Sequence, residues 1–310
     1  MIPVFFLLLP GSLVLDWAGP AEAFRIAGGF DLHFIGPVES PRTSVGVSVT
    51  GIEPLPEHLP EGAWIVLVGM PGPRFDPKQS GAPQSLRWLR TLKPGEQGLR
   101  IVTICAGALI AAHAGLLDGR RATTHHHHLD ELRSVAPSCE VVANRVFVLD
   151  DEVASSAGVT TGIDLALHLI AQEKGAPVAS RVAQAMVVAL RRGPQDPELS
   201  PFLAHRDHMH PVLHRVQDAV CAEPQRDWSV ARMAEVGRTS PRHLTRLFVE
   251  HGGTAPLLYL RRIRIALAQA ALASGQGVTR AAELAGFSSD TQLRRAWQRF
   301  GLAGRPSDRI

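Results

Sequence analysis

The stretch LRIVTICAGALIAAHAGLLDGRRATTHHHH, residues 99–128, carries the clearest fold signal in the chain. An aliphatic run without polar alternation leads to Cys105, as expected of a strand that is covered on both faces. A stretch rich in alanine and leucine follows directly, and these residues favour a helix. We therefore predict a buried strand, a sharp turn at Cys105 and a helix that begins there. A strand followed at once by a helix is the repeating unit of a parallel α/β sheet.

The remainder of the first 190 residues repeats this alternation. Apolar runs bounded by glycine or proline are the predicted strands, at 4–9, 30–36, 63–69 and 99–105. Helical periodicity is found at 20–27, 82–92 and 128–135 and twice within 161–190, and short strands are expected within 140–150. The pattern predicts an α/β domain over residues 1–190, with a parallel sheet sandwiched between helices.

Residues 191–210 form a predicted linker. Their first part, RRGPQDPELSPF, has three prolines, one glycine and no apolar period. From 211 to 310 no strand is expected, and the order helix, tight turn, helix occurs twice around one long helix. Ser240 and Ser288 are predicted to start the second helix of each pair. The C-terminal domain is therefore predicted to be all-α with a duplicated helix pair.

Charge is distributed unevenly between the two parts of the chain. Residues 1–200 carry 16 Lys and Arg against 20 Asp and Glu, a formal net charge of −4. Residues 201–310 carry 16 Arg against 9 Asp and Glu, a formal net charge of +7. A basic C-terminal domain favours a polyanionic partner, and we predict that this partner is nucleic acid.

The composition indicates a reducing compartment and no membrane. The three cysteines, Cys105, Cys139 and Cys221, are odd in number and widely spaced, unlike a disulfide framework. The opening MIPVFFLLLPGS lacks a basic residue before its apolar run and is predicted to be a first strand rather than a signal peptide. No later apolar run approaches the roughly 20 residues needed to span a bilayer. We expect a cytoplasmic protein with no membrane partner.

The second helix of each predicted pair has an inner apolar stripe and an outer polar face. One such face alone would be ordinary solvated surface. Two of them in a basic domain, each after a short helix and a turn, predict helices that read DNA in the major groove. The outward residues are Arg242, Thr245 and Arg246 in the first helix and Thr291, Arg294 and Arg295, with Gln292 at the flank, in the second.

The span 211–310 resembles the AraC-type DNA-binding domain. The resemblance rests on MAEVGRTSPRHLTRLF, GGTAPLLYLRRIRIALA and AAELAGFSSDTQLRRAWQRFG, and it implies seven helices with two helix-turn-helix units joined by a long helix. The base-facing residues that it implies are Arg242, Thr245, Arg246, Asp290, Thr291, Gln292 and Arg295. The family usually has a turn glycine where this chain has Arg238, so the first turn is expected to be strained or differently shaped. Asp290 would repel phosphate unless it accepts from a cytosine amine.

Cys105 admits two interpretations. It is a nucleophile elbow whose helix N-terminus favours a thiolate, or it is a small buried hydrophobic residue. The stretches LLLPGSLVLDWAGPAEAF, VTICAGALIAAHAGLLDGRRATTH and SSAGVTTGIDLALHLI resemble the PfpI-like branch of the class I glutamine amidotransferase fold. More narrowly, they resemble the N-terminal domain of GlxA-type AraC-family regulators. The resemblance implies a flavodoxin-like α/β sandwich, favours the elbow, and places Asp16 near the thiol and His125 at the edge of the pocket.

Two departures from that pattern argue against turnover. Ala106 stands where hydrolytic relatives often have a histidine, and GMPG at 69–72 replaces two consecutive glycines. A thiol without a general base lacks assistance that is typically worth about 10²–10⁴ in rate. We therefore predict a sensor rather than an enzyme. The rival hypothesis is a Cys105-dependent amidase, hydratase or glyoxalase with an appended DNA-binding domain.

Four consecutive histidines, residues 125–128, follow the predicted helix. In an extended segment neighbouring side chains point to opposite faces, so at most two of these histidines could share one ion. We predict no metal site and no cofactor. A pH- or ligand-responsive pocket wall and a solvated loop remain the open alternatives.

These features together predict a transcriptional regulator. The α/β domain would bind a small metabolite or respond to a reactive species, and the helical domain would bind promoter DNA. Operators of AraC-type proteins are commonly read by paired protomers, so we expect a homodimer formed through residues 1–190. RNA polymerase is a further candidate partner.

Overall fold

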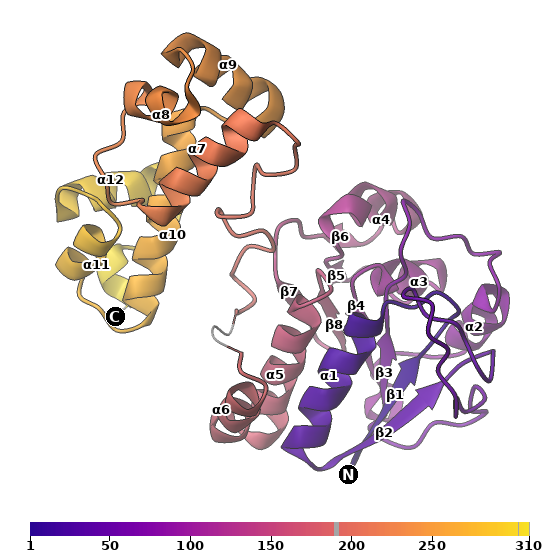
Figure 1. Cartoon of the computed structure of the whole chain (residues 1–310). Coiled ribbons are helices and arrows are strands. Elements are labelled where there is room, and N and C mark those ends of the chain that lie inside the picture. The colour runs from indigo at the N-terminus through magenta and orange to yellow at the C-terminus, as the bar shows by residue number, and fades with distance from the viewer. Residues whose placement is uncertain (189–191, 303, 310) are drawn as a thin grey trace. The chain divides into compact units, whose positions relative to one another are not determined.

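The computed structural model describes residues 1–188, 192–302 and 304–309, and the chain divides into two compact units, Met1–Glu198 and Leu199–Ile310 (Figure 1). The domain boundary predicted between 190 and 191 lies outside the described residues. No described helix is both long enough and apolar enough to cross a bilayer.

A six-stranded sheet forms the centre of the first unit, in the order β2-β1-β3-β4-β8-β7. The first five strands in this order, β2, β1, β3, β4 and β8, run parallel to one another. The last strand, β7, is antiparallel to β8. Their bounds are β1 (Ile2–Leu7), β2 (Phe30–Ile35), β3 (Trp64–Leu67), β4 (Arg100–Ile104), β7 (Phe147–Asp150) and β8 (Val153–Ser156). A small separate sheet pairs β5 (Arg121–Ala122) with β6 (Glu140–Val141). The parallel strands have the flavodoxin-like order, which confirms the predicted fold class.

Helices cover both faces of this sheet (Figure 1). One layer consists of α1 (Val14–Ala27), α5 (Thr161–Lys174) and α6 (Ala176–Ala185), and the other of α2 (Ala82–Leu89), α3 (Gly107–His113) and α4 (Leu129–Val135). Because both faces are covered, the strands are apolar throughout: all four residues of β3 are buried. Parallel strands end at one edge of a sheet, so the loops after β1, β3, β4 and β8 meet there.

The start of α1 differs from the prediction. We expected a helix over 20–27, but α1 begins at Val14 and carries Pro20 in its interior. Proline lacks an N–H and usually marks a helix start, which is why the sequence misled. The first turn is held by tertiary contacts instead, since the buried Asp16 carboxylate accepts hydrogen bonds from the N–H groups of Gly69 and Val159.

The second unit contains helices and no strand among its described residues. It contains α7 (Pro211–Ala222), α8 (Val230–Gly237), α9 (Pro241–Gly252), α10 (Pro256–Ala273), α11 (Val278–Leu284), α12 (Asp290–Arg299) and the 3₁₀ turn η3 (Pro306–Arg309). The pairs α8–α9 and α11–α12 are the two predicted helix-turn-helix units. Within the described range a 3₁₀ turn takes the place of the seventh helix that the resemblance implied.

Two separate hydrophobic clusters explain why the second unit needs a long central helix. Tyr259 and Ile263 of α10 pack into the first cluster with α7, α8 and α9. Ala268 and Leu272, farther along the same helix, pack into the second cluster with α11 and α12. Each helix pair therefore has its own core, and α10 joins the two cores.

The caps of the two second helices differ in one detail from the prediction. Ser240 caps α9 as expected, because its Oγ accepts a hydrogen bond from the His243 N–H at 3.2 Å. The corresponding residue of α12 is Ser289, not Ser288: its Oγ accepts from the Gln292 N–H at 3.3 Å. Gln292 in turn accepts from the Ser288 N–H at 2.9 Å. The Ser289-x-x-Gln292 spacing is that of a capping box, but the Gln292 side chain binds the N–H of Ser288, one residue before the N-cap.

The first turn also has an unusual conformation. Arg238, at the C-cap of α8, has φ 52° and ψ 49°. This is the left-handed region that a family glycine would occupy without cost. The turn is therefore a strained version of the usual one, as the substitution predicts.

Residues predicted as linker pack on the two units. On the first unit, the Arg192 N–H donates to Asp164 Oδ1 at 2.9 Å and the Val146 N–H donates to the Asp196 carbonyl at 3.0 Å. On the second unit, the Gln217 side chain donates to the His205 carbonyl at 2.8 Å. Along the chain, the first unit ends at Glu198 and the second begins at Leu199.

Candidate functional site

Helix α9 presents the first candidate recognition face. Leu244, Leu247 and Phe248 are buried in the core, as predicted, and Arg242 and its outward neighbours are exposed. The Oγ1 of Thr245 donates to the Pro241 carbonyl at 2.9 Å, and an Arg246 Nη lies 3.0 Å from His243 Nδ1. The sequence therefore placed all three candidate side chains of this helix on its exposed face.

Helix α12 presents the second candidate face, and here the predicted residues divide into two groups. Thr291 and Arg295 are exposed, whereas Leu293 and Trp297 are buried. The side chains of the other two candidates, Asp290 and Gln292, already make hydrogen bonds within the chain. Gln292 caps the helix start, and Asp290 Oδ2 accepts from Thr279 Oγ1 at 3.0 Å. Asp290 thus joins α12 to α11 through this hydrogen bond.

A basic groove beside α12 was missed by the sequence analysis. It has a volume of about 330 Å³, and its basic residues are Arg261, Arg264, Arg295 and Arg299. Arg264 is fixed by hydrogen bonds to the carbonyls of Pro224 and Arg226, both at 2.8 Å. The arginines of the LRRIRI stretch of α10 were visible in the sequence. Helical periodicity, however, does not show that α10 and α12 lie next to each other.

Cys105 occupies the turn between β4 and α3, as predicted for an elbow. Its φ is 57°, in the left-handed region, which is strained for a residue with a Cβ. Its N–H donates to the Ser156 carbonyl at 3.1 Å, and its carbonyl accepts from Thr124 Oγ1 at 2.8 Å. Gly158 lies so close that a Cβ there would be 2.7 Å from Cys105 Sγ.

Asp16 lies against this thiol, as the resemblance implied. The side chain is fully buried, and its two oxygens accept from the Gly69 N–H at 3.0 Å and the Val159 N–H at 2.9 Å. The Cys105 thiol also hydrogen-bonds to it. Burial raises the pKa of Asp16 to about 6, although the hydrogen bonds that it accepts oppose the increase.

The structure does not favour a thiolate at Cys105. The residue is only 4% exposed, and burial together with the Asp16 carboxylate raises the pKa of the thiol to about 12. The thiol is therefore protonated at neutral pH, because desolvation outweighs the helix N-terminus that we expected to favour the anion.

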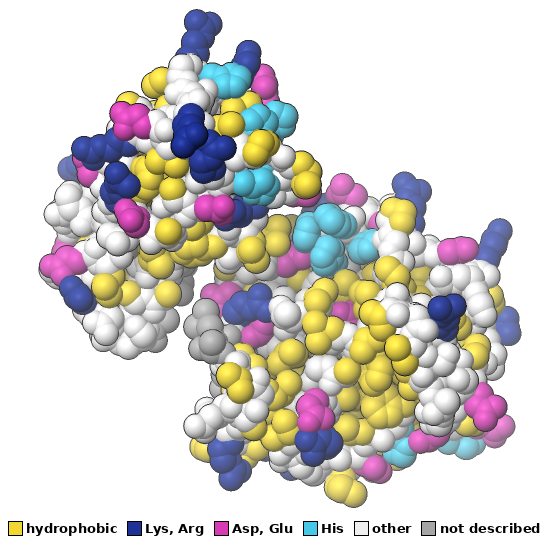
Figure 2. Space-filling model, viewed as in Figure 1, with side chains coloured by type: hydrophobic (Ala, Val, Ile, Leu, Met, Phe, Trp, Pro, Cys, Tyr) yellow, Lys and Arg dark blue, Asp and Glu magenta, His cyan; other side chains and the backbone are white. Residues whose placement is uncertain are grey.

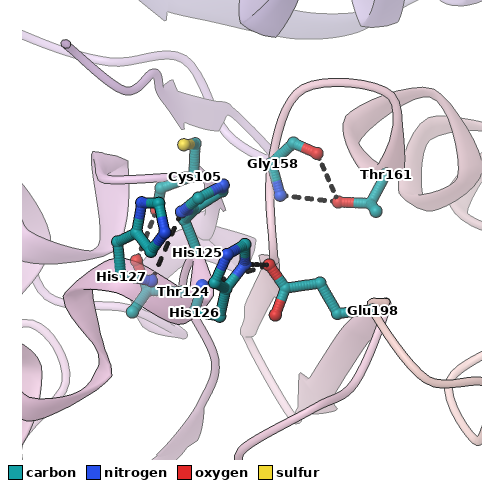
Figure 3. Close-up of polar contacts among 8 residues, drawn as sticks. All are labelled: Cys105, Thr124, His125, His126, His127, Gly158, Thr161 and Glu198. Atoms are coloured by element: carbon teal, nitrogen blue, oxygen red, sulfur yellow. Dashed lines mark hydrogen bonds and ion pairs between the residues drawn. The ribbon is translucent and has the colours of Figure 1, made fainter. Parts of the chain in front are cut away.

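His125 does not act as a base for this thiol. Among the described residues no hydrogen bond joins an imidazole to Cys105 Sγ, and Figure 3 shows the polar contacts that are made. Burial and the three neighbouring histidines lower the pKa of His125 to about 4, so its ring is neutral at pH 7. A small cavity of about 10 Å³ lies on the other side of the turn, lined by Ala106 and His128 but not by Cys105.

The histidine run is not extended. Residues His126–His128 form the 3₁₀ turn η2, and the ring centroids of residues 125–127 lie 4.2–4.9 Å apart. One nitrogen of each of these three rings lies within 4.8 Å of the others. The argument that at most two of the histidines could share an ion is therefore wrong, because a tight turn brings three of them to one side.

Comparison with known proteins matches a different family to each of the two units of the structure. Residues 3–172 match the DJ-1/PfpI family, and residues 233–301 match a helix-turn-helix domain family. The first match covers the sheet and the thiol, and the second covers α9 to α12 with part of α8.

Several relatives resemble the chain over most of its length. The HTH-type transcriptional regulator CdhR of Pseudomonas aeruginosa is 30% identical over 98% of this chain and 90% of its own length. The HTH-type transcriptional regulator GlxA of Rhizobium meliloti is 32% identical over 95% of this chain and 91% of its own. Isonitrile hydratase of Pseudomonas putida is 30% identical over 58% of this chain and 76% of its own. The two regulators therefore share both units, whereas the resemblance to the hydratase covers little more than half of this chain.

Proposed function

The chain belongs to the DJ-1/PfpI family and, over nearly its whole length, to the GlxA-type group of AraC-family transcriptional regulators, and from this premise we propose how its two units divide the work. The second unit binds promoter DNA through α9 and α12. The first unit binds a small-molecule effector and adjusts that binding.

The observation that carries the DNA-binding role is the repeated geometry of the second unit. Each of α9 and α12 follows a short helix, starts at a serine N-cap and exposes arginine opposite its buried stripe. Arg242, Arg246 and Arg295 have the length and donor geometry to reach guanine edges, while Thr245 and Thr291 can meet a phosphate or a thymine methyl group. The +7 charge of residues 201–310 supplies the attraction to the phosphate backbone.

The first unit acts without turnover. Cys105 is protonated and buried, and no imidazole is hydrogen-bonded to it within the described residues. A hydrolase, hydratase or glyoxalase needs an activated nucleophile, which this arrangement does not supply. The site responds to an effector by opening, and the loops after β1, β3, β4 and β8 are the parts that would move.

The protein works as a cytoplasmic homodimer that pairs through its first unit. Two double helix-turn-helix units then read the two halves of one operator, and effector binding changes the strength or geometry of that pairing. An ordinary allosteric coupling of this kind is about 1–3 kcal/mol. RNA polymerase is the second macromolecular partner of a regulator that activates, and neither unit needs an organic cofactor.

The test is selection of bound sequences from a random DNA duplex library with the full-length protein. We expect an enriched motif with two sub-sites, because two recognition helices of one chain contact neighbouring turns of the groove. Arg25→Ala is the matched control: it removes one exposed arginine from α1 in the first unit and is expected to enrich the same motif. Recovery of sequences without any preference would overturn the proposal.

A further inference from the structure

Three imidazoles of the first unit converge on one point of its surface. Figure 2 shows a histidine cluster (cyan) on this unit, and Figure 3 shows the rings of His125, His126 and His127 grouped together. The 3₁₀ turn η2 is what brings them to one side. We propose that these three side chains bind one divalent transition-metal ion, and that Zn²⁺ is the ion they suit.

The ligand chemistry points to this class of metal. Neutral imidazole nitrogen suits zinc, nickel and copper, whereas magnesium and calcium require sets of oxygen ligands. Tetrahedral zinc with bonds of about 2.0–2.1 Å places its nitrogen ligands about 3.3 Å apart. Because the three nitrogens already lie within 4.8 Å of one another, modest side-chain rotations complete the site. Water fills the fourth position.

Glu198 prepares one of these ligands. Its Oε1 accepts from the His126 backbone N–H at 3.0 Å and lies 2.7 Å from His126 Nδ1. The carboxylate side chain is only 7% exposed. A proton held on Nδ1 by this carboxylate leaves the Nε2 lone pair free for a metal, which is how carboxylates orient histidine ligands in metal sites.

Of the neighbouring histidines, His125 and His127 are available as metal ligands and His128 is not. The ring of His127 makes no hydrogen bond among the described residues, and His125 Nδ1 accepts only a long one, 3.4 Å, from the His127 N–H. Both rings can therefore turn toward an ion at little cost. His128 is excluded, because it is buried and its Nδ1 contacts Glu131 Oε2 at 3.2 Å.

The site also involves the end of the first unit. Glu198 is 72 residues from His126 in the chain and is the last residue of that unit. An ion that fixes the His126 ring also strengthens the pairing of that ring with Glu198. Metal binding is thus expected to hold residues 192–198 more firmly on the first unit.

The experiment titrates Zn²⁺ into untagged, metal-free, full-length protein against a chromogenic chelator. We expect one ion per chain, and Co²⁺ in its place should give the visible absorption of a four-coordinate site. His126→Ala and His127→Ala should abolish this stoichiometric site, and Glu198→Gln should weaken it by about 10–100-fold. His58→Ala, which removes an exposed histidine from a distant loop, is the matched control and should bind like the parent chain.

Hydrogen exchange supplies a second readout. Zn²⁺ should slow exchange in residues 192–198 of the parent chain and leave it unchanged in His127→Ala. The proposal is overturned if the parent chain binds no stoichiometric Zn²⁺, or if the His126 and His127 variants retain the same site. The second outcome would assign the ion to other histidines, such as those of the second unit. Because Glu198→Gln leaves the histidine run intact, it keeps the test decisive even if an alanine variant fails to fold.

Discussion

Asp16 and Cys105 form a buried pair in which the carboxylate opposes ionisation of the thiol, whereas the thiol slightly favours the ionised carboxylate. Burial is the largest cause of the raised pKa of both groups, and the charge of Asp16 adds to it for the thiol. The resemblance to the PfpI-like branch implied that these residues meet. It did not predict their protonation states, because desolvation depends on everything packed around them, including Gly69 and Gly158.

Asp16 should make the protein less stable as the pH rises from about 4 to about 7. Its pKa is about 6 in the folded protein against 3.8 for the ordinary carboxyl, so the folded state binds the proton more tightly. The stabilisation is fully present below pH 3.8 and is lost as the pH rises through 6, on the order of 3 kcal/mol in total. Urea unfolding at several pH values gives the free energy of unfolding of the parent chain and of Asp16→Asn. We expect the parent value minus the Asp16→Asn value to fall as the pH rises. If this value stays constant or increases with pH, burial does not destabilise the ionised carboxyl.

Cys105 should be nearly inert toward iodoacetamide at pH 8. A thiol that is 4% exposed and has a pKa of about 12 offers very little thiolate to react. Mass-spectrometric mapping should show labelling at least about 100-fold slower than for the same cysteine in urea-unfolded protein. Equal rates in the folded and unfolded chains would restore the reactive thiol that the elbow motif suggested.

The helix boundaries show which elements could be predicted from the sequence. Strands and helices with a clear period were placed correctly, and so was Ser240 as an N-cap. The errors arose at element ends: Pro20 is tolerated inside α1, and Ser289 rather than Ser288 caps α12. The histidine run failed in the same way, because alternation was assumed where a 3₁₀ turn forms.

The turn after α8 should be improved by a single substitution. Arg238 holds a left-handed conformation at φ 52°, so Arg238→Gly is expected to stabilise the second unit by about 0.5–1 kcal/mol. The opposite substitution can be made at Gly253, which ends α9. This glycine has φ 60°, and a Cβ there would meet no other atom within 4 Å. Gly253→Ala should therefore destabilise by a similar amount through backbone strain alone. Thermal unfolding of both variants checks the pair, and a loss of stability in Arg238→Gly would contradict the strain argument.

The whole molecule combines an α/β unit and a helical unit whose cores are separate. This division was predictable, because hydrophobic period, charge and turn residues all change near residue 200. The burial of the thiol and the basic groove between α10 and α12 were not predictable, since both depend on contacts between distant segments.

Pairing of protomers should depend on the first unit. In sedimentation experiments we expect the full chain to be a dimer and a fragment of residues 199–310 to be a monomer, since the pairing surface is proposed to lie in the first unit. The full chain should also bind a two-half-site operator more tightly and more cooperatively. A fragment that dimerises as well as the full chain would place the pairing surface in the helical unit.

The most direct measurement is the affinity of the full chain for its selected DNA site relative to a scrambled duplex, at one fixed salt concentration. We expect Arg246→Ala on α9 and Arg295→Ala on α12 each to cost about 1–3 kcal/mol on the selected site and much less on the scrambled duplex. Arg25→Ala, in the first unit, should leave the ratio of the two affinities unchanged. If both recognition-helix variants keep that ratio, or lose affinity equally for both duplexes, then α9 and α12 do not read base sequence and the central claim is contradicted.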